Sequence, residues 1–311
     1  MPRLHLPLLR LLCALLCLLP LPAAGGTDPA FTPVTATDDA GHTARFERPA
    51  RRVIALYGAF NELLLALGAR DALVARTAAD GSLPELASLP AVGTHMRPNA
   101  ELIAAQRPDL VLQLSGRDEA RVQTEHLREL GFTVLSFELN SFEQMFAVTE
   151  LLGRVTGREA RARELLRDWR ERLRGLRGRY AGLQPVRVFY EVRYPNLLAA
   201  GAGGITGEIL ALAGGANVVR DGKKLVRFNE EALVVADPEA YVIQKGPMNP
   251  APVPPADRVH YRNLRAVREG RVLVVDEARF ARPGPRALDA AEELGDWLHP
   301  QARPAGAREK P

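Results

Sequence analysis

Apolar residues recur at spacings of three or four in two successive stretches near the middle of the chain, between about Phe142 and Tyr180. The first stretch contains Phe142, Met145, Phe146, Leu152 and Val155, and the second contains Ala162, Leu165, Leu166, Trp169, Leu173, Leu176 and Tyr180. This spacing is typical of amphipathic helices. Gly153 and Gly157 interrupt the pattern, and Thr156 with Glu159 has the spacing of a capping box. We therefore predict one helix that ends near Val155 and a second, ~30 Å long, from about Arg158 to Arg177.

The sequences on the two sides of these helices resemble each other. Residues 62–68 read E-L-L-L-A-L-G, and residues 208–214 read E-I-L-A-L-A-G. In each, an acidic residue opens a short apolar helix that a glycine ends. Two further matched stretches, 99–103 and 229–233, lead through a proline into a run typical of a β-strand. Matched features in the same order predict two similar α/β lobes, with chance similarity of helix-forming stretches as the alternative.

Short apolar runs predict the sheet of each lobe. The alternating stretch 31–46 turns at Asp39-Ala40-Gly41 and is typical of a β-hairpin. Further strands are expected at residues 52–56, 73–75, 91–93, 110–114 and 133–137, and then at 186–192, 241–244 and 271–275; helices are expected at 121–130 and 287–298. We predict an α/β protein of two Rossmann-like lobes, residues 26–141 and 181–299, with a ligand cleft between them. Linker helices at 142–180, including a single long α-helix, join the lobes.

The two ends of the chain have compositions unlike the rest. Arg3 and Arg10, an apolar core at residues 11–19 and small residues before Gly26 predict a signal peptide, residues 1–25, cleaved near Gly25. Cys13 and Cys17 lie within this segment, so the mature chain would contain no disulfide and no cysteine-ligated metal. Leu16 is large for lipoprotein processing at Cys17, which favours a soluble exported protein but leaves lipidation open. Residues 300–311 are expected to form a flexible tail.

The charge of the chain excludes some classes of partner. The formal net charge is +4, and about +2 remains once Arg3 and Arg10 are removed with the signal peptide. No basic block with interleaved aromatic residues is present, so we expect no nucleic-acid partner. No later apolar run is long enough to span a membrane. We expect a monomer that binds a small molecule.

In open α/β sheets, ligands bind beyond the carboxyl ends of the strands. The side chains expected there are cationic, aromatic or polar. They are Tyr57, His95, Met96, Arg97, Ser115, Arg117, Arg193, Tyr194, Gln244, Lys245, Arg279 and Arg282. Together with Phe280, this set predicts a cleft for a bulky, partly apolar ligand with anionic groups. The alternative is that these loops are simply polar in an arginine-rich protein.

The chain lacks the motifs of common catalytic sites. We find no G-x-S-x-G, H-E-x-x-H or Walker sequence, and we therefore predict no enzymatic activity and no catalytic residues. Gly201, Gly203 and Gly207 depart from the dinucleotide-binding spacing. The histidines are scattered, so no metal site is predicted, although His95 is a possible ligand. Tyr57 or Tyr194 is a possible phenolate ligand to ferric iron.

Glu62 and Glu208 occupy matching positions in the repeat. A glutamate in the first turn of a helix is stabilised by the helix dipole at ~0.3–1 kcal/mol, which is one explanation for both. The other is that the two lobes present a pair of acidic residues to arginines on two matched subunits of a partner.

Several short motifs stand in a characteristic order. They are 52–56 followed by 61–68, Val92-Gly93 with Pro98-Asn99-x-Glu101-x-Ile103, 107–112, 207–210 with 214–217, and Arg282-Pro283-Gly284-Pro285-Arg286. From about Phe31 to Pro300, the chain resembles the periplasmic substrate-binding proteins of ABC importers for iron–siderophore, haem and cobalamin, in their helical-backbone class. The resemblance implies two α/β lobes with a ligand between them, a long linking helix and limited hinge motion.

The resemblance also implies partners and a ligand class. One glutamate in each lobe, Glu62 and Glu208 here, would dock onto arginines of an ABC permease dimer that works with an ATPase. No resident cofactor is expected; the ligand would be an iron chelate, with a ferric siderophore first. Haem is an alternative, since haem binders use a tyrosine or histidine and His95 lies in a suitable loop. An oxyanion such as molybdate is another.

Cobalamin binders tend to line the cleft with tryptophan, whereas Trp169 and Trp297 fall on predicted helices. This departure makes cobalamin a weaker alternative. Two alternatives of other classes are a secreted two-lobed α/β enzyme and a sensor module that binds a ligand for a signalling partner.

Overall fold

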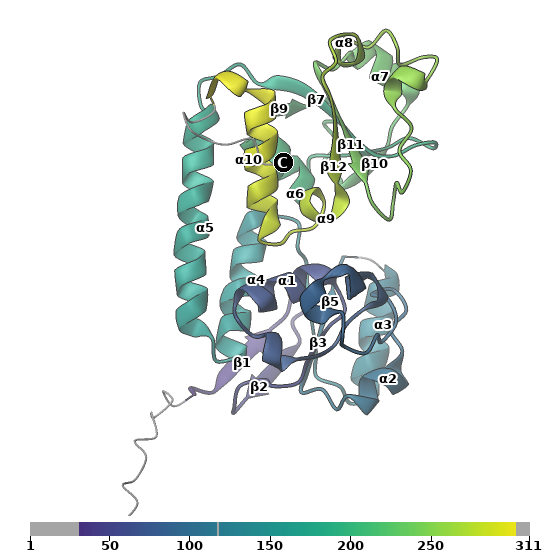
Figure 1. Cartoon of the computed structure of the whole chain (residues 1–311). Helices are drawn as coiled ribbons and strands as arrows, with labels where there is room; N and C mark the ends of the chain where they lie inside the picture. The colour runs from purple at the N-terminus through teal and green to yellow at the C-terminus, as the bar shows by residue number, and fades with distance from the viewer. Residues whose placement is uncertain (1–30, 117, 303–311) are drawn as a thin grey trace, which may run out of the picture.

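The computed structural model describes residues 31–302 except Arg117, and it shows two α/β lobes beside a set of long helices (Figure 1). The predicted signal peptide, Cys13, Cys17 and the tail from residue 303 lie outside the described residues. Among the residues that are described, no helix is both long and apolar enough to cross a membrane.

The first lobe is built on a four-stranded parallel sheet in the order β4-β3-β5-β6. Its strands are β3 (Val53–Ala55), β4 (Leu73–Ala75), β5 (Leu110–Leu114) and β6 (Val134–Phe137). Its helices are α1 (Gly58–Ala66), α2 (Ala100–Ala105) and α3 (Asp118–Glu129). Every residue of β3, β5 and β6 is buried, as expected for parallel strands covered on both faces. The predicted hairpin is confirmed as β1 (Val34–Thr37) paired with β2 (Thr43–Phe46).

The second lobe has a mixed sheet in the order β10-β8-β7-β11-β12, with β9 also paired to β7. Its strands are β7 (Val186–Arg193), β8 (Leu198–Ala200), β9 (Gly215–Asn217), β10 (Leu225–Arg227), β11 (Ala240–Lys245) and β12 (Val272–Asp276). Its helices are α6 (Ile205–Leu212), α7 (Glu230–Ala236), α8 (Arg265–Arg268), α9 (Glu277–Phe280) and α10 (Arg286–Leu298).

The strand predicted at residues 91–93 of the first lobe is wrong, because only isolated bridges form there, at Ala91 and Gly93.

The two lobes share one topology, which confirms the fold predicted from the repeat. The parallel strands β9-β7-β11-β12 of the second lobe have the same chain order as β4-β3-β5-β6 of the first. Helix α6 takes the place of α1, and α10 that of α4 (Phe142–Val155), which follows β6. The antiparallel pair β8 and β10 is an addition of the second lobe, and the sequence did not predict it.

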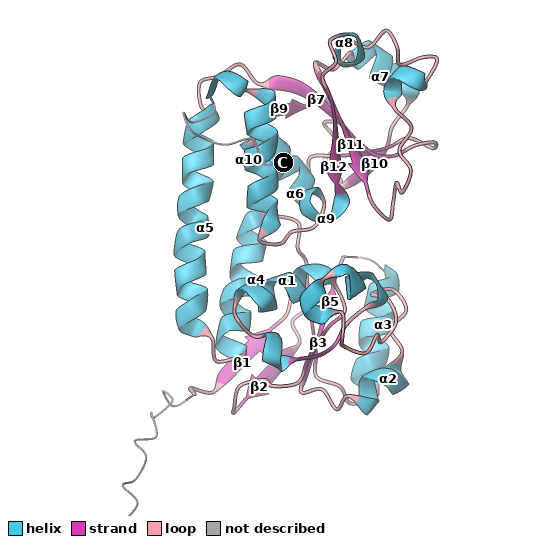
Figure 2. Ribbon diagram, in the orientation of Figure 1, coloured by secondary structure: helices cyan, strands magenta, loops and turns pink. Residues whose placement is uncertain are grey.

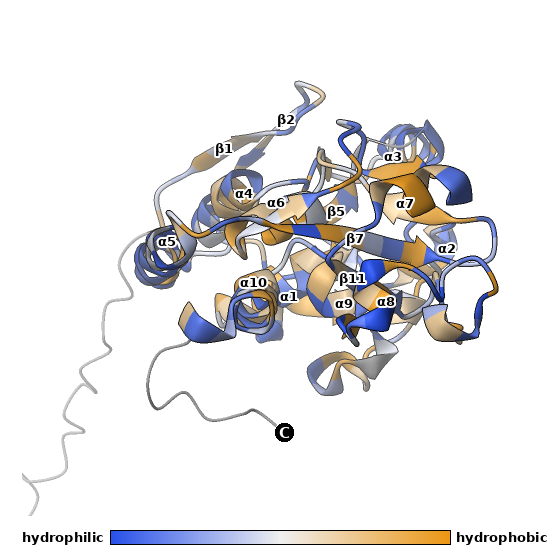
Figure 3. Ribbon diagram, turned by 90° about the horizontal axis from the view of Figure 1, so that it is seen from above, coloured by the Kyte–Doolittle hydropathy of each residue, from blue (hydrophilic) through white to orange (hydrophobic). Residues whose placement is uncertain are grey.

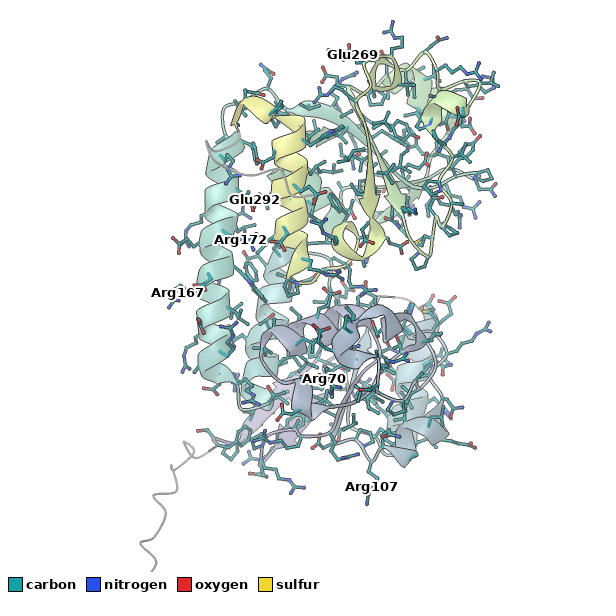
Figure 4. All side chains as sticks on the ribbon, viewed as in Figure 1. Arg70, Arg107, Arg167, Arg172, Glu269 and Glu292 are labelled. Carbon is teal, nitrogen blue, oxygen red and sulfur yellow. The ribbon has the colours of Figure 1, made fainter. Side chains whose placement is uncertain are left out.

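The helix α5 (Glu159–Tyr180) lies alongside both lobes and forms an antiparallel pair with α4 (Figure 2). Its bounds agree with the predicted linker helix. Trp169 stacks on Phe146 of α4 with ring centroids 6.2 Å apart. Toward its carboxyl end α5 packs on α10, where Arg172 bonds Asp289 at 2.6 Å and also lies 3.6 Å from Glu292 (Figure 4). The remaining surface of α5 is largely hydrophilic (Figure 3).

The carboxyl ends of the two sheets point toward each other. Helix α1 follows β3, and α9 follows β12. Glu62 on α1 contacts Arg282, which comes two residues after α9. Figure 1 shows α1 facing α6 and α9 between the two sheets. The loops after the parallel strands therefore belong to the region where the lobes meet.

The packing of α5 on α10 depends on Gly295. Because a Cβ at this position would overlap the ring of Tyr180, we expect Gly295→Ala to destabilise the protein by about 1–3 kcal/mol. Gly175→Ala on the exposed face of α5, where a Cβ meets nothing within 4 Å, is the matched control and should stabilise the protein by about 0.5–1 kcal/mol. Urea unfolding of both variants measures the two effects, and equal shifts would contradict the predicted packing.

Candidate functional site

The loops beyond the carboxyl ends of the first-lobe strands, here called the first-lobe edge, bring a phenol and an imidazole side chain together. The corresponding loops of the second lobe are called the second-lobe edge. Tyr57 directly precedes α1, and its half-buried ring meets the ring of His95 edge-on, with centroids 6.0 Å apart and planes at 64°. The side chain of Gln113 on β5 donates from Nε2 to the backbone oxygen of His95 at 2.9 Å, which holds the loop in place. Met96 and Arg97 follow in that loop, and Ser115 follows β5. The hydroxyl of Ser115 is buried and has no hydrogen-bond partner among the described residues.

The second-lobe edge is only partly as predicted. Arg193 and Lys245 end β7 and β11, and the Lys245 side chain is exposed. Gln244 is fully buried, and its Oε1 accepts a hydrogen bond from the Tyr190 hydroxyl at 3.3 Å. Burial raises the pKa of Tyr190 well above its ordinary value, with Glu277 and Asp276 acting in the same direction. Gln244 therefore supports the edge from inside the lobe.

Tyr194 is held in place by a buried ion pair that the sequence analysis missed. The guanidinium of Arg258 lies over the ring of Tyr194, 3.8 Å from its centroid. Arg258 also makes two hydrogen bonds to the buried carboxylate of Glu191, at 2.5 and 2.8 Å. Burial alone would lower the pKa of Arg258, but these bonds raise it above its ordinary value. Arg258 comes from the proline-rich loop far along the chain, so no local pattern links it to Tyr194.

Two of the predicted ligand-binding arginines have partners within the protein. Arg279 bonds Glu293 of α10 at 2.5 Å, and Arg282 bonds Glu62 at 3.0 Å. Among the described residues, 31–116 and 118–302, the side chains of Arg97, Arg193 and Lys245 form no hydrogen bond or ion pair. Arg117 is not among the described residues. The cationic character of the two edges therefore rests on fewer residues than the sequence suggested.

Glu62 is buried between the lobes. Its side chain is 7 % exposed and accepts hydrogen bonds from Arg282 at 3.0 Å and from Arg286 at 2.6 and 3.1 Å. The bond with Glu62 raises the pKa of Arg286 although burial opposes the rise. One first-lobe carboxylate thus binds two second-lobe arginines.

Glu208 makes the reciprocal contact. Its Oε2 accepts the backbone N–H of Phe142 at 2.7 Å. Phe142 is the first residue of α4, just as Arg286 is the first residue of α10. The matching glutamates of the repeat therefore both bind the opposite half of the chain. Glu62 binds the start of α10, and Glu208 binds the start of α4.

One cavity lies at the second-lobe edge, and a second lies beside the hairpin of β1 and β2. One of about 470 Å³ is lined by Lys245, Gly246, Pro247, Pro250, Val274, Val275 and Asp276, at the carboxyl ends of β11 and β12. Another, of about 700 Å³, lies beside β2 and the start of β6, away from the strand ends. In the described part of the chain, no group of three or more His, Cys, Asp or Glu residues is placed to hold a metal ion. Trp169 lies in the core and Trp297 under Arg271, so both are remote from the two edges.

Comparison with known proteins agrees with this architecture. A vitamin B12-binding protein of Vibrio cholerae is 28% identical over 256 residues, which cover 80% of this chain and 90% of that protein. An ABC transporter substrate-binding lipoprotein of Bacillus subtilis is 27% identical over 274 residues, which cover 86% of each.

Solved structures give the same result. The periplasmic vitamin B12 binding protein of Vibrio cholerae matches with a TM-score of 0.70 at 26% identity, covering 82% of this chain and 99% of that one. A periplasmic heme binding protein from Pseudomonas aeruginosa matches with a TM-score of 0.71 at 26% identity, covering 83% and 95%. The relatives are named as binding proteins, in line with the predicted absence of catalysis. Residues 53–278 match the family model for periplasmic binding proteins, and the chain belongs to this family of ABC-importer substrate-binding proteins.

Proposed function

We propose that the protein captures a metallated tetrapyrrole outside the cytoplasm and delivers it to the permease of an ABC importer. The observation that carries this proposal is the contact between Tyr57 and His95 on the first-lobe edge. Phenolate and imidazole are both ligands of haem iron, and their rings offer apolar faces to a large macrocycle.

The charges at the edges suit the substituents of such a ligand. Arg97, Arg193 and Lys245 are cations that the protein itself leaves without carboxylate partners in its described part, and they suit the propionates of haem or the phosphate of a corrinoid. The names of the relatives include both haem and vitamin B12 binders. Within the class, haem is favoured, because neither tryptophan of the described chain lies at an edge where a corrinoid would stack.

A ferric siderophore is the second candidate. The same three cations and the Tyr57 phenol favour an anionic iron chelate. Fewer cations are available to such a chelate than the sequence suggested, since Arg279 and Arg282 are neutralised by Glu293 and Glu62.

Absorption spectra test the ligand class. We expect the purified protein to retain a Soret band after addition of haemin and desalting, and Tyr57→Phe or His95→Gln to shift that band and weaken haemin binding about tenfold or more, the equivalent of one coordinate or charge-assisted bond. Trp297→Phe is the control and should leave the spectrum unchanged. Retention of cobalamin alone would assign a corrinoid, and retention of only a ferric siderophore would reject the tetrapyrrole.

Docking on the permease is tested separately from ligand binding. Glu62 and Glu208 are the proposed contacts for permease arginines. Glu208 is partly exposed, so Glu208→Gln should weaken docking about ten- to a hundredfold by removing a charge-assisted bond. Glu62 is buried and already bound by Arg282 and Arg286, so Glu62→Gln should weaken docking less. The exposed Glu171→Gln on α5, outside the repeat, is the control. Binding to the permease and ATPase in lipid nanodiscs measures this, with ligand affinity recorded in parallel. Unchanged docking by both variants would rule out these residues as the contacts.

A further inference from the structure

Five arginines stand in one line on the exposed surface of α5. Their spacing alternates between four and three residues, which keeps them on a single face of the helix over about 20 Å. The five, here called the arginine stripe, are Arg163, Arg167, Arg170, Arg174 and Arg177. All of them are exposed. The stripe borders a groove of about 320 Å³ between α4 and α5, which is lined by Glu150, Leu166 and the first four arginines of the stripe.

The protein leaves most of the charge of the arginine stripe without a counter-charge. Arg170, Arg174 and Arg177 form no hydrogen bond or ion pair with the rest of the described chain. The other two members pair only with exposed carboxylates of α5 itself, at 3.4 and 3.0 Å, and exposed pairs of this kind contribute little. The stripe is therefore a line of positive charge that is open to solvent.

The opposite side of α5 shows how arginines are treated where this helix packs on the protein. Arg172 and Arg179 bond carboxylates of α10 at distances between 2.6 and 3.4 Å. Figure 4 shows Arg172 turned toward Glu292, whereas Arg167 of the stripe points away from the neighbouring helices. The helix has eight arginines and four carboxylates, an excess that equals the formal net charge of the whole chain, +4. Arginines that face the protein are matched, and those of the stripe are left for another partner.

The surroundings of the arginine stripe decide the kind of partner. Stable protein interfaces bury an apolar centre, but none of the large apolar side chains that the described structure exposes lies on α4 or α5. The fork of a guanidinium group binds phosphate oxygens through two parallel hydrogen bonds. A membrane surface presents many phosphate groups in one plane, so a straight line of guanidinium groups can bind several of them without inserting into the hydrocarbon.

We propose that the arginine stripe binds the headgroups of anionic phospholipids and holds α5 along a membrane surface. Each basic residue near such a surface strengthens binding about fivefold. Figures 1 and 3 show α5 at the outer side of the lobes, away from α9, so this contact leaves the region where the strand ends meet uncovered. The biological role rests on the proposed function: the stripe would keep the protein at the membrane that contains its permease.

Vesicle flotation tests the proposal with the protein that begins at Gly26, so that the apolar segment 11–19 is absent. We expect binding to vesicles of phosphatidylglycerol mixed with phosphatidylcholine, no binding to phosphatidylcholine alone, and weaker binding at higher salt. Arg170→Gln combined with Arg174→Gln removes two unpaired cations and should weaken binding about 25-fold. Equal binding to both kinds of vesicle would overturn the proposal.

One exposed arginine from each lobe provides the matched control. Arg107 follows α2 and Arg268 ends α8, and both are exposed. Arg107→Gln combined with Arg268→Gln changes the net charge by the same amount and should leave vesicle binding unchanged. A loss equal to that of the stripe variant would show an effect of net charge alone and would contradict the stripe as the binding site. Glutamine is a good helix former, and equal urea midpoints would confirm that the stripe variant is folded.

Two further measurements separate this inference from its alternatives. Binding of soluble poly-glutamate through the stripe, without binding to vesicles, would assign an acidic polypeptide as the partner and reject the lipid. The flotation assay contains neither ligand nor permease, and the stripe variant should retain the Soret band of bound haemin. Failure to bind vesicles would therefore reject the stripe and leave the proposed function standing, whereas failure to bind haemin would do the reverse.

Discussion

The arrangement of the two lobes depends on a pair of reciprocal contacts made by carboxylates at their interface. Glu62 on α1 binds the side chain of Arg286 at the start of α10, and Glu208 on α6 binds the backbone of Phe142 at the start of α4. A buried carboxylate is tolerated only when its oxygens are paired, and Glu62 has three hydrogen bonds from two arginines. These bonds fix which strand ends face each other.

The helix α5 supports this interface from the side. Its apolar face packs on α4 through Trp169 and Phe146, and Tyr180 fits against Gly295 of α10. Arg172 and Arg179 add ion pairs to Asp289, Glu292 and Asp296, each partly exposed and individually worth little. Close packing therefore does most to hold α5 against both lobes. The proposed ligand site between them is better suited to a largely preformed shape than to wide closure.

The fold was predictable because its determinants are local or repeated. The spacing of hydrophobic residues located α4 and α5. The similar stretches at residues 62–68 and 208–214 indicated that the two lobes match. The short strands β8 and β10 were missed since three residues carry too little pattern to stand out. The contacts of the site were harder to predict. Glu62 and Arg282 are 220 positions apart, and Arg258 reaches Tyr194 from a proline-rich loop, so neither pairing leaves a signal in spacing or composition. Residue types at strand ends indicated a cationic cleft, but only the folded chain shows which cations are already neutralised.

The reciprocity of the two glutamate contacts has the form of an isologous interface, in which one surface meets a copy of itself. Each half contributes a first-helix carboxylate and receives one from the other half at the start of its own last helix. A single unit with these features, present twice, would form a closed pair about a twofold axis, and a linker such as α5 would join the copies into one chain. Once joined, the halves are free to diverge. The two contacts now differ in kind: arginine side chains meet Glu62, whereas a backbone amide meets Glu208.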